Sequence, residues 1–296
     1  MTQRRAGILG LGICLPEKVL TNFDLEKMVD TTDEWIRTRT GIKERRIAEN
    51  GTKTSDLAAK ASLEAIESAK LKPSDIDLII VATISGDMIF PATACVVQNK
   101  IGARCPAFDL SAACSGFPYG LAVADGLIRS GAHQHILVIG AEVISSFINW
   151  KDRSTCVLFG DGAGAAVVGT VPAGHGIMAT YWGSDGAQAN LLYIPAGGSA
   201  IPPSASSVDS GLHYLQMDGS EIFKSAVRTM TDAVFEVMKR ANLKLEEIDC
   251  LIPHQANLRI LNAVSERTGI PSDKVFINLD RYGNMSAAST VVALYE

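Results

Sequence analysis

The stretch Ala65-Ile-Glu-Ser-Ala-Lys-Leu-Lys-Pro-Ser-Asp-Ile-Asp-Leu-Ile79 returns in altered form as Val237-Met-Lys-Arg-Ala-Asn-Leu-Lys-Leu-Glu-Glu-Ile-Asp-Cys-Leu251, at a constant offset of 172 residues. Each copy predicts the end of a helix, a short polar turn and a buried strand. A second pair, Phe108-Asp-Leu110 and Ile277-Asn-Leu279, lies at an offset of 169 and again precedes a segment rich in small residues. The sequence therefore predicts a duplicated α/β unit.

The residues around the first copy alternate between helical and strand patterns. Alanine and leucine recur at helical spacing from 54 to 70, with Thr54 or Ser55 as the N-cap, and Ile76 to Ala82 is a continuous apolar run typical of a strand covered on both faces. Further elements are expected at 6–15 (strand), 22–29 (helix capped by Asn22), 92–100 (helix), 107–110 (strand), 117–129 (helix) and 136–140 (strand). This alternation is typical of an α/β protein.

Two glycine-rich segments have simpler explanations than a ligand loop. Phe159-Gly-Asp-Gly-Ala-Gly-Ala-Ala-Val-Val168 has neither a Walker lysine nor the G-x-G-x-x-G spacing, so it predicts a tight turn into a strand. Residues 195–211 are rich in Pro, Gly and Ser without periodicity and predict a long loop.

Composition excludes several classes of protein. The chain has 296 residues, 47% of them hydrophobic, and a net charge of −5, whereas a dedicated nucleic-acid binder carries a basic excess. Six scattered cysteines with no CxxC pair predict neither a disulfide framework nor a structural metal site, and they fit a reducing cytoplasm.

The N-terminal apolar run predicts a strand. Glycines interrupt the run after Arg4-Arg5, so we expect a first strand there rather than a signal peptide. No apolar run of the sequence is long enough for a membrane span.

Cys114 lies in Pro106-Ala-Phe-Asp-Leu-Ser-Ala-Ala-Cys-Ser-Gly-Phe-Pro-Tyr-Gly120, between the predicted strand and the predicted helix. Unpaired N–H groups and the positive end of the helix dipole stabilise a thiolate at such a place, which predicts a nucleophile at neutral pH. A cysteine among alanines is also typical of a small buried hydrophobic residue.

Two other polar residues follow predicted strands of the second half. His254 comes directly after 249–252, and Asn284 follows 275–279. If the halves are related by a pseudo-twofold axis, these strand ends converge with that of Cys114, because ligands in open α/β sheets bind at the carboxyl ends of strands. His254 as a structural histidine, and Asn284 as a turn or N-cap residue, are the alternatives.

A thiolate, a histidine and an asparagine amide suit acyl transfer. The thiolate forms a thioester, and the two N–H donors stabilise the enolate oxygen that forms when a malonyl thioester loses CO₂. A cysteine protease uses the same residue types with histidine as the base, so the residues alone leave the reaction open.

The densest basic stretch of the chain surrounds a tryptophan. Asp33-Glu-Trp-Ile-Arg-Thr-Arg-Thr-Gly-Ile-Lys-Glu-Arg-Arg46 contains five cations, and Trp35 precedes them. An exposed indole beside guanidinium groups suits stacking on a nucleotide base while the cations bind its phosphates. A solvated basic loop with a core tryptophan is the alternative.

These segments together resemble a known family. Ala112-Ala-Cys-Ser-Gly116, Pro253-His-Gln-Ala-Asn257, Gly283-Asn-Met-Ser-Ala-Ala-Ser289, Trp35-Ile-Arg-Thr-Arg-Thr-Gly41 and Phe159-Gly-Asp-Gly-Ala-Gly164 resemble, in order and across the chain, β-ketoacyl-acyl-carrier-protein synthase III of the thiolase superfamily. The resemblance implies a duplicated αβαβα fold and a homodimer. It also implies an acyltransferase that starts type II fatty-acid synthesis by condensing an acyl-CoA primer with malonyl-acyl carrier protein, without a metal or a further cofactor.

The resemblance also assigns site residues. It implies Cys114 as the acylated nucleophile, and His254 and Asn284 as the pair that promotes decarboxylation. For coenzyme A and substrate binding it implies Trp35, Arg39, Arg153, Phe90, which closes the acyl pocket across the dimer, Asn257 and Phe223. Arg259 with Lys224 resembles the basic patch that docks the carrier protein.

The resemblance divides the chain into a half with the nucleophile, 1–172, and a half with the histidine and asparagine, 173–296.

The sequence departs from the family in two places. The family usually has a further glycine-rich segment after the position of Glu296, so we expect the sequence to be truncated there. Ser220 replaces an asparagine that is common in the pantetheine tunnel. A related condensing enzyme of secondary metabolism and a catalytically silent subunit are the alternative functions. The preferred primer is not predicted.

Overall fold

A five-stranded mixed sheet forms the centre of the first half of the computed structural model, which describes residues 5–296. The strand order is β1-β7-β6-β4-β5, with β6, β4 and β5 parallel and β7 antiparallel to both of its neighbours. The strands are β1 (Arg5–Cys14), β4 (Leu78–Ala82), β5 (Ala107–Leu110), β6 (His135–Glu142) and β7 (Gly162–Val171). All five were expected from sequence, including the turn that leads into β7.

Alternate residues of the central strands point into two different cores. Ile79 and Val81 pack under α3 (Thr54–Ser68) and α4 (Thr93–Ile101), on one face of the sheet. Ile80 and Val138 pack against α5 (Gly116–Ser130) on the other face, where Val291 of α11 (Ala287–Tyr295) joins them. Both faces are therefore apolar, which explains the continuous hydrophobic runs in β4 and β6.

Glycines allow two of these layers to approach very closely. A Cβ at Gly12 of β1 would overlap backbone atoms of Ala61 and Ala65 in α3. A Cβ at Gly140 of β6 would overlap the carbonyl group of Ala287, at the start of α11. The second contact holds the turn before α11 against the carboxyl end of β6.

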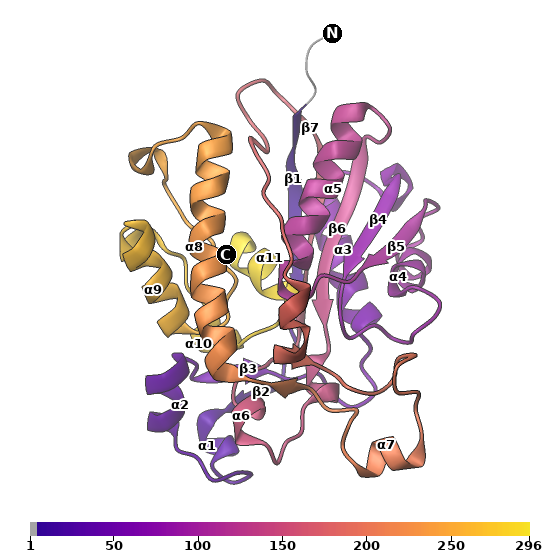
Figure 1. The fold of residues 1–296 in the computed structure, drawn as a ribbon. Coiled ribbons are helices and arrows are strands. Elements are labelled where there is room, and N and C mark those ends of the chain that lie inside the picture. The colour runs from indigo at the N-terminus through magenta and orange to yellow at the C-terminus, as the bar shows by residue number, and fades with distance from the viewer. Residues whose placement is uncertain (1–4) are drawn as a thin grey trace.

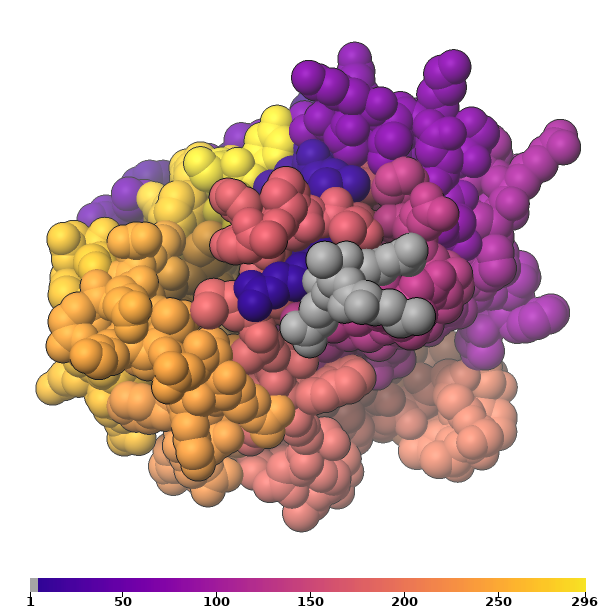
Figure 2. All heavy atoms as spheres, turned by 90° about the horizontal axis from the view of Figure 1, so that it is seen from above, coloured from indigo at the N-terminus to yellow at the C-terminus, as the bar shows by residue number. Residues whose placement is uncertain are grey.

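The second half adds an outer helical layer. The helices α8 (Gly219–Ala241) and α9 (Leu258–Thr268) pack on each other through Val227, Ile260 and Val264. Figure 1 shows α11 between this pair and the sheet. In Figure 2, seen from above, the orange and yellow second half lies beside the indigo to magenta first half.

The expected strands 249–252 and 275–279 are much shorter than predicted. They meet in a single parallel bridge, in which Leu251 N donates to Lys274 O (2.8 Å) and Leu251 O accepts from Phe276 N (2.9 Å). Leu279 already belongs to α10 (Leu279–Tyr282). Each segment pairs only with the other among residues 5–296, so no longer ladder extends them.

Three local predictions also need correction. The helix expected at 22–29 is α1 (Asn22–Leu25), and its N-cap is Thr21, which accepts a bond from Asp24 N. The side chains of Thr54 and Ser55 bond to Ser85 O and Asp87 rather than capping α3. The loop expected at 195–211 contains a short helix, α7 (Ala205–Asp209), which Ser204 caps.

The remaining elements are short. They are β2 (Val19–Thr21), α2 (Asp33–Thr40), β3 (Glu44–Arg46), α6 (Arg153–Cys156), β8 (Leu192–Tyr193), α7 (Ala205–Asp209) and β9 (Gln216–Met217), with 3-10 turns at 73–75, 113–115, 144–147, 186–191, 245–247 and 272–274.

Candidate active site

Cys114 lies in the 3-10 turn that joins β5 to α5. Ala113, directly before it, has φ +46°, a left-handed conformation that costs energy for a residue with a Cβ. The thiol is half-buried and lines an apolar cavity of about 200 Å³. The cavity lining comprises Ile84, Ala113, Cys114, Ile144, Leu192, Tyr193, Ile194, Leu215 and Ser286.

The helix argument predicts a thiolate at Cys114, but the surroundings of the thiol oppose its ionisation. Burial raises its pKa to about 11, the charge of Glu142 raises it further, and the Ser286 hydroxyl opposes both. The prediction rested on the helix N-terminus, but α5 begins only at Gly116, and burial disfavours the charged thiolate.

Asn284 is buried in the segment before α11, where it forms a parallel β-bridge with Phe159, and it is not the N-cap of α11. Its backbone bonds to Leu158 O (2.8 Å) and Gly160 N (3.0 Å), and its Oδ1 accepts from Ser286 N (2.8 Å). That last bond fixes the orientation of the amide and leaves Nδ2 as its donor end. Through Ser286, which lines the cavity, the Asn284 turn is adjacent to Cys114.

His254 follows the bridge residue Leu251, and neither ring nitrogen has a hydrogen-bond partner within residues 5–296. Burial lowers the pKa of the imidazole to about 4, so the ring is neutral at pH 7. The next residue, Gln255, ties this segment to the one before Asn284, because Asn278 N donates to Gln255 Oε1 (2.9 Å). A neutral imidazole with unpaired nitrogens can serve as a hydrogen-bond donor without changing its charge.

We expect His254 to make the free energy of unfolding depend on pH. Its folded pKa of about 4 lies below the ordinary value of 6.5, so its contribution is complete above pH 6.5 and is lost as the pH falls toward 4. The full loss is roughly 3 kcal/mol. Urea unfolding of the native protein and of His254→Gln between pH 7.5 and 4 measures it: the native curve should fall relative to the variant, and parallel curves would contradict the prediction.

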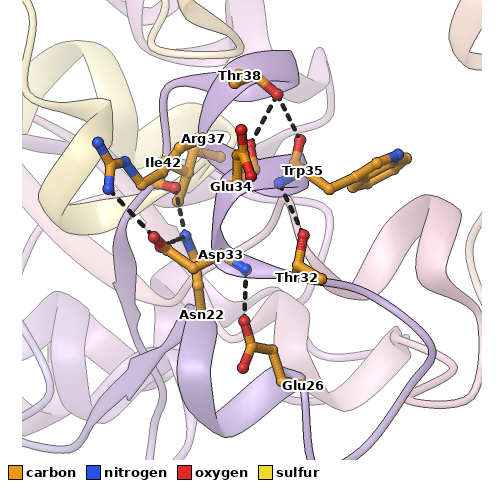
Figure 3. A network of polar contacts seen from close by, with 9 residues as sticks. All are labelled: Asn22, Glu26, Thr32, Asp33, Glu34, Trp35, Arg37, Thr38 and Ile42. Carbon is orange, nitrogen blue, oxygen red and sulfur yellow. Dashed lines mark hydrogen bonds and ion pairs between the residues drawn. The ribbon is translucent and has the colours of Figure 1, made fainter.

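Trp35 in α2 lies under two arginines, one from the basic stretch and one from α6. The guanidinium groups of Arg39 and Arg153 lie 4.9 and 4.8 Å from the indole ring centre. Thr32 caps α2 by accepting from Trp35 N (3.1 Å). Figure 3 shows the indole directed away from the polar network that fixes the helix. The ring is partly buried and packs against the core around Ile36.

The polar network beneath Trp35 explains why α2 is so well anchored. Asn22, which is fully buried, donates to Asp33 Oδ1 (2.9 Å) and to Ile42 O (2.8 Å). Arg37 pairs with Asp33 (3.1 Å), and Glu26 accepts from Asp33 N (2.6 Å). Of the five cations, only Arg37 and Arg39 lie in α2, whereas Arg45 in β3 is fully buried and donates to Asn22 Oδ1 (2.9 Å) and Val157 O (2.7 Å).

The other residues expected to bind the substrate or to dock the carrier protein lie in two places. Asn257 caps α9 and its Nδ2 donates to Arg39 O (3.1 Å), which links it to the Trp35 cluster. Arg259 lies over the Phe223 ring at 5.5 Å, and the neighbouring Lys224 pairs with Glu221 at 2.6 Å.

Phe90 lies apart from these residues. Its side chain is 86% exposed and does not line the cavity; Met88 and Ile89 beside it are 50% and 86% exposed. An exposed apolar segment of this kind is typical of a surface that contacts a partner.

Glu142 and Ser286 border the site and were missed by the sequence analysis. Glu142 directly follows the apolar run of β6, at a strand end, which is the same feature that singled out His254. Ser286 lies two residues after Asn284. Within residues 5–296 no group of His, Cys, Asp or Glu side chains is arranged to hold a metal ion.

The fold is the thiolase fold. With a half-buried cysteine over an apolar cavity at a strand-to-helix turn, it defines an acyltransferase of this fold. The sequence-family model of 3-oxoacyl-[acyl-carrier-protein] synthase III matches residues 108–186, and the family model of its C-terminal part matches residues 238–296. The chain belongs to the β-ketoacyl-[acyl-carrier-protein] synthase III family.

Relatives of that family match almost the whole chain. The protein from Caldanaerobacter subterraneus subsp. tengcongensis is 60% identical over 98% of this chain and 88% of its own length. The protein from Clostridioides difficile is 55% identical over 99% and 89%. The synthase III from Aquifex aeolicus, whose crystal structure is known, is 49% identical in sequence. Its structure matches with a TM-score of 0.90 over 98% of this chain and 89% of that chain.

No helix among the residues described, 5–296, is long and apolar enough to cross a membrane.

Proposed function

We propose that the chain condenses an acyl primer, delivered by coenzyme A, with malonyl-acyl carrier protein, and so starts type II fatty-acid synthesis. Membership of the synthase III family supports the reaction class. The observation that carries the proposal is the position of Cys114, whose thiol opens on an apolar cavity beside the turn of Asn284. An apolar cavity suits an acyl chain, and a thiol beside it suits a thioester.

In the proposed reaction Cys114 takes the acyl group first, and coenzyme A leaves. The malonyl thioester then loses CO₂, and the enolate carbon attacks the acyl-Cys114 carbonyl. We assign His254 and Asn284 Nδ2 as the two donors to the enolate oxygen. The depressed pKa of His254 supports this role, because a neutral N–H donor needs no proton exchange during the step.

We assign the binding of coenzyme A to the Trp35 cluster, with Arg39, Arg153 and Asn257, and to Phe223 nearby. Coenzyme A is a substrate here, and the proposed reaction uses no further cofactor. Arg259 and Lys224 are proposed to dock the acidic carrier protein. The chain is proposed to act as a homodimer in which the exposed Phe90 closes the partner's cavity, which the 86% exposure of its side chain supports.

Parallel condensation assays with malonyl-acyl carrier protein and with malonyl-CoA test the proposed acceptor. A strong preference for the carrier protein supports fatty-acid initiation. Equal use of both would favour a related condensing enzyme of secondary metabolism. No condensation with either, in a protein that forms no acyl adduct, would indicate a catalytically silent subunit.

We expect Trp35→Ala to weaken the binding of coenzyme A by about 1–3 kcal/mol, the usual contribution of stacking a base on an aromatic ring. Calorimetric titration with coenzyme A measures the loss. Trp182→Ala is a matched control, since that indole is half exposed and packs edge-on against Tyr119 rather than under arginines. An unchanged affinity in Trp35→Ala, or an equal loss in both variants, would contradict the assignment.

A further inference from the structure

The side chain of Arg45 is fully buried although it carries a charge. Burial lowers its pKa to about 10, so the guanidinium group is still protonated at neutral pH. None of the ion pairs formed within residues 5–296 includes it. A buried charge without a carboxylate partner is rare and costly. Arg45 belongs to the basic stretch, but a guanidinium group in the core cannot bind the phosphates of a ligand, so its position needs another explanation.

The hydrogen bonds of Arg45 join two parts of the fold. Its Nη1 donates to Asn22 Oδ1 (2.9 Å) and to Leu20 O (3.1 Å), and its Nη2 donates to Val157 O (2.7 Å). Asn22 uses its other amide atom, Nδ2, to donate to Asp33, as Figure 3 shows, so the orientation of Oδ1 toward Arg45 is fixed. The planar guanidinium fork is therefore held at one end and supports Val157 at the other.

Val157 begins the segment that holds the backbone of Asn284. Asn284 N donates to Leu158 O (2.8 Å), and Asn284 O accepts from Gly160 N (3.0 Å). Between these two bonds, Asn284 forms the parallel bridge with Phe159. The carbonyl that accepts from Arg45 thus comes one residue before the carbonyl that accepts from Asn284.

The stem of Arg45 lies close to both sides of this bridge. A Cβ added to Gly160 would lie 3.1 Å from Arg45 Cβ, and one added to Gly283 would lie 3.3 Å from it. Gly283 directly precedes Asn284 and has φ +64°, in the left-handed region that favours glycine. Arg45 therefore supports the Asn284 bridge in two ways, through the packing of its stem and through the hydrogen bond of its guanidinium group to Val157.

We propose that Arg45 is a positioning residue for Asn284 in the decarboxylation step. The inference rests on the proposed role of Asn284 as a donor to the enolate oxygen. Asn284 Oδ1 is held by Ser286 N, from the same short segment, so the place of the Nδ2 donor depends on where the backbone of that segment lies. Because a displacement of about 1 Å can reduce a catalysed rate about a hundredfold, a support beneath this backbone affects the reaction without touching the substrate.

Arg45→Met tests the proposal, because methionine keeps an unbranched stem beside Gly160 and Gly283 but has no N–H donor. Decarboxylation of malonyl-acyl carrier protein, followed as CO₂ release at saturating substrate, should fall at least about tenfold. Acylation of Cys114 at saturating acetyl-CoA, followed by intact mass, should stay near the native rate, because the bonds of Asn22 Nδ2 that anchor α2 do not involve Arg45. Native-like decarboxylation, or equal losses in both steps, would overturn the proposal.

A double variant separates positioning of Asn284 from a general structural role. In Arg45→Met/Asn284→Ala the amide to be positioned is absent, so CO₂ release should lie within about twofold of that of Asn284→Ala alone. If Arg45→Met instead costs as much in the Asn284→Ala protein as in the native protein, Arg45 acts elsewhere and the proposal is wrong. If Asn284→Ala alone keeps native decarboxylation, the proposed role of Asn284 fails, and this inference fails with it.

Arg129→Met is the matched control. That guanidinium group also donates to a backbone carbonyl, Ile177 O (2.8 Å), but it lies in the last turn of α5, at the end away from Cys114. It should leave the ratio of decarboxylation to acylation unchanged, and a change in this ratio as large as that in Arg45→Met would overturn the proposal.

Arg45→Lys is the second variant should Arg45→Met fail to fold. It keeps the charge but replaces the two-pronged fork with one ammonium group, which does not reproduce the geometry of the bonds to Asn22 and Val157. It should therefore lose decarboxylation while it keeps acylation. Loss of neither activity, or an equal loss of both, would contradict the proposed role of Arg45.

Discussion

Cys114→Ser should lose acyl transfer from acetyl-CoA by at least about a thousandfold, since loss of a covalent nucleophile commonly costs more than that. The substitution keeps the shape of the side chain but replaces the thiol with a hydroxyl, which ionises far less readily. Burial already raises the pKa of the thiol to about 11, and the same surroundings oppose an alkoxide even more strongly. No adduct should therefore appear by intact mass.

The structure offers a matched control for this prediction. Burial also raises the pKa of Cys156 to about 11, but that thiol packs in a core with Val157 and Phe159 and does not line the cavity. Cys156→Ala should keep the acetyl adduct. An adduct that survives in Cys114→Ser, or one that is lost in Cys156→Ala alone, would show that Cys114 is not the nucleophile.

The architecture of the first half could be predicted almost completely from the sequence. Its strands are buried on both faces, so Ile76 to Ala82 and the run at 136–140 carry an unbroken apolar pattern that few other structures produce. The strands of the second half could not be predicted in extent, because a strand depends on its neighbours. The segments around Leu251 and Val275 find only each other among residues 5–296. The division of the chain at residue 172 stays a prediction.

The residues of the site stay a prediction, and its electrostatics could not be predicted from the sequence. The strand-end argument selected Cys114, His254 and Asn284, and the structure places the Asn284 turn beside Cys114 through Ser286. The raised pKa of the Cys114 thiol was not anticipated, because desolvation depends on atoms that surround the thiol in space and leave no local trace in the sequence. Glu142 could have been found by applying the same strand-end argument to β6.

His254→Ala and Asn284→Ala should each retain acylation of Cys114 but lose decarboxylation of malonyl-acyl carrier protein by about 10²–10³-fold, the usual cost of one donor to an oxyanion. The reason is that neither side chain is needed for thiol attack, whereas both are proposed to stabilise the enolate. Intact mass measures the first step and CO₂ release measures the second. Loss of acylation in either variant would contradict this division of roles.

Two conservative variants separate hydrogen-bond donation from support of the local structure. Asn284→Asp keeps an oxygen for the Ser286 N–H but replaces the donor amide with an acceptor, so it should lose decarboxylation as fully as Asn284→Ala. His254→Gln keeps an N–H donor and should retain more activity than His254→Ala. Because both donors serve one oxygen, the double variant His254→Ala/Asn284→Ala should lose less than the product of the single losses. Fully multiplicative losses would instead mean that the two residues act independently.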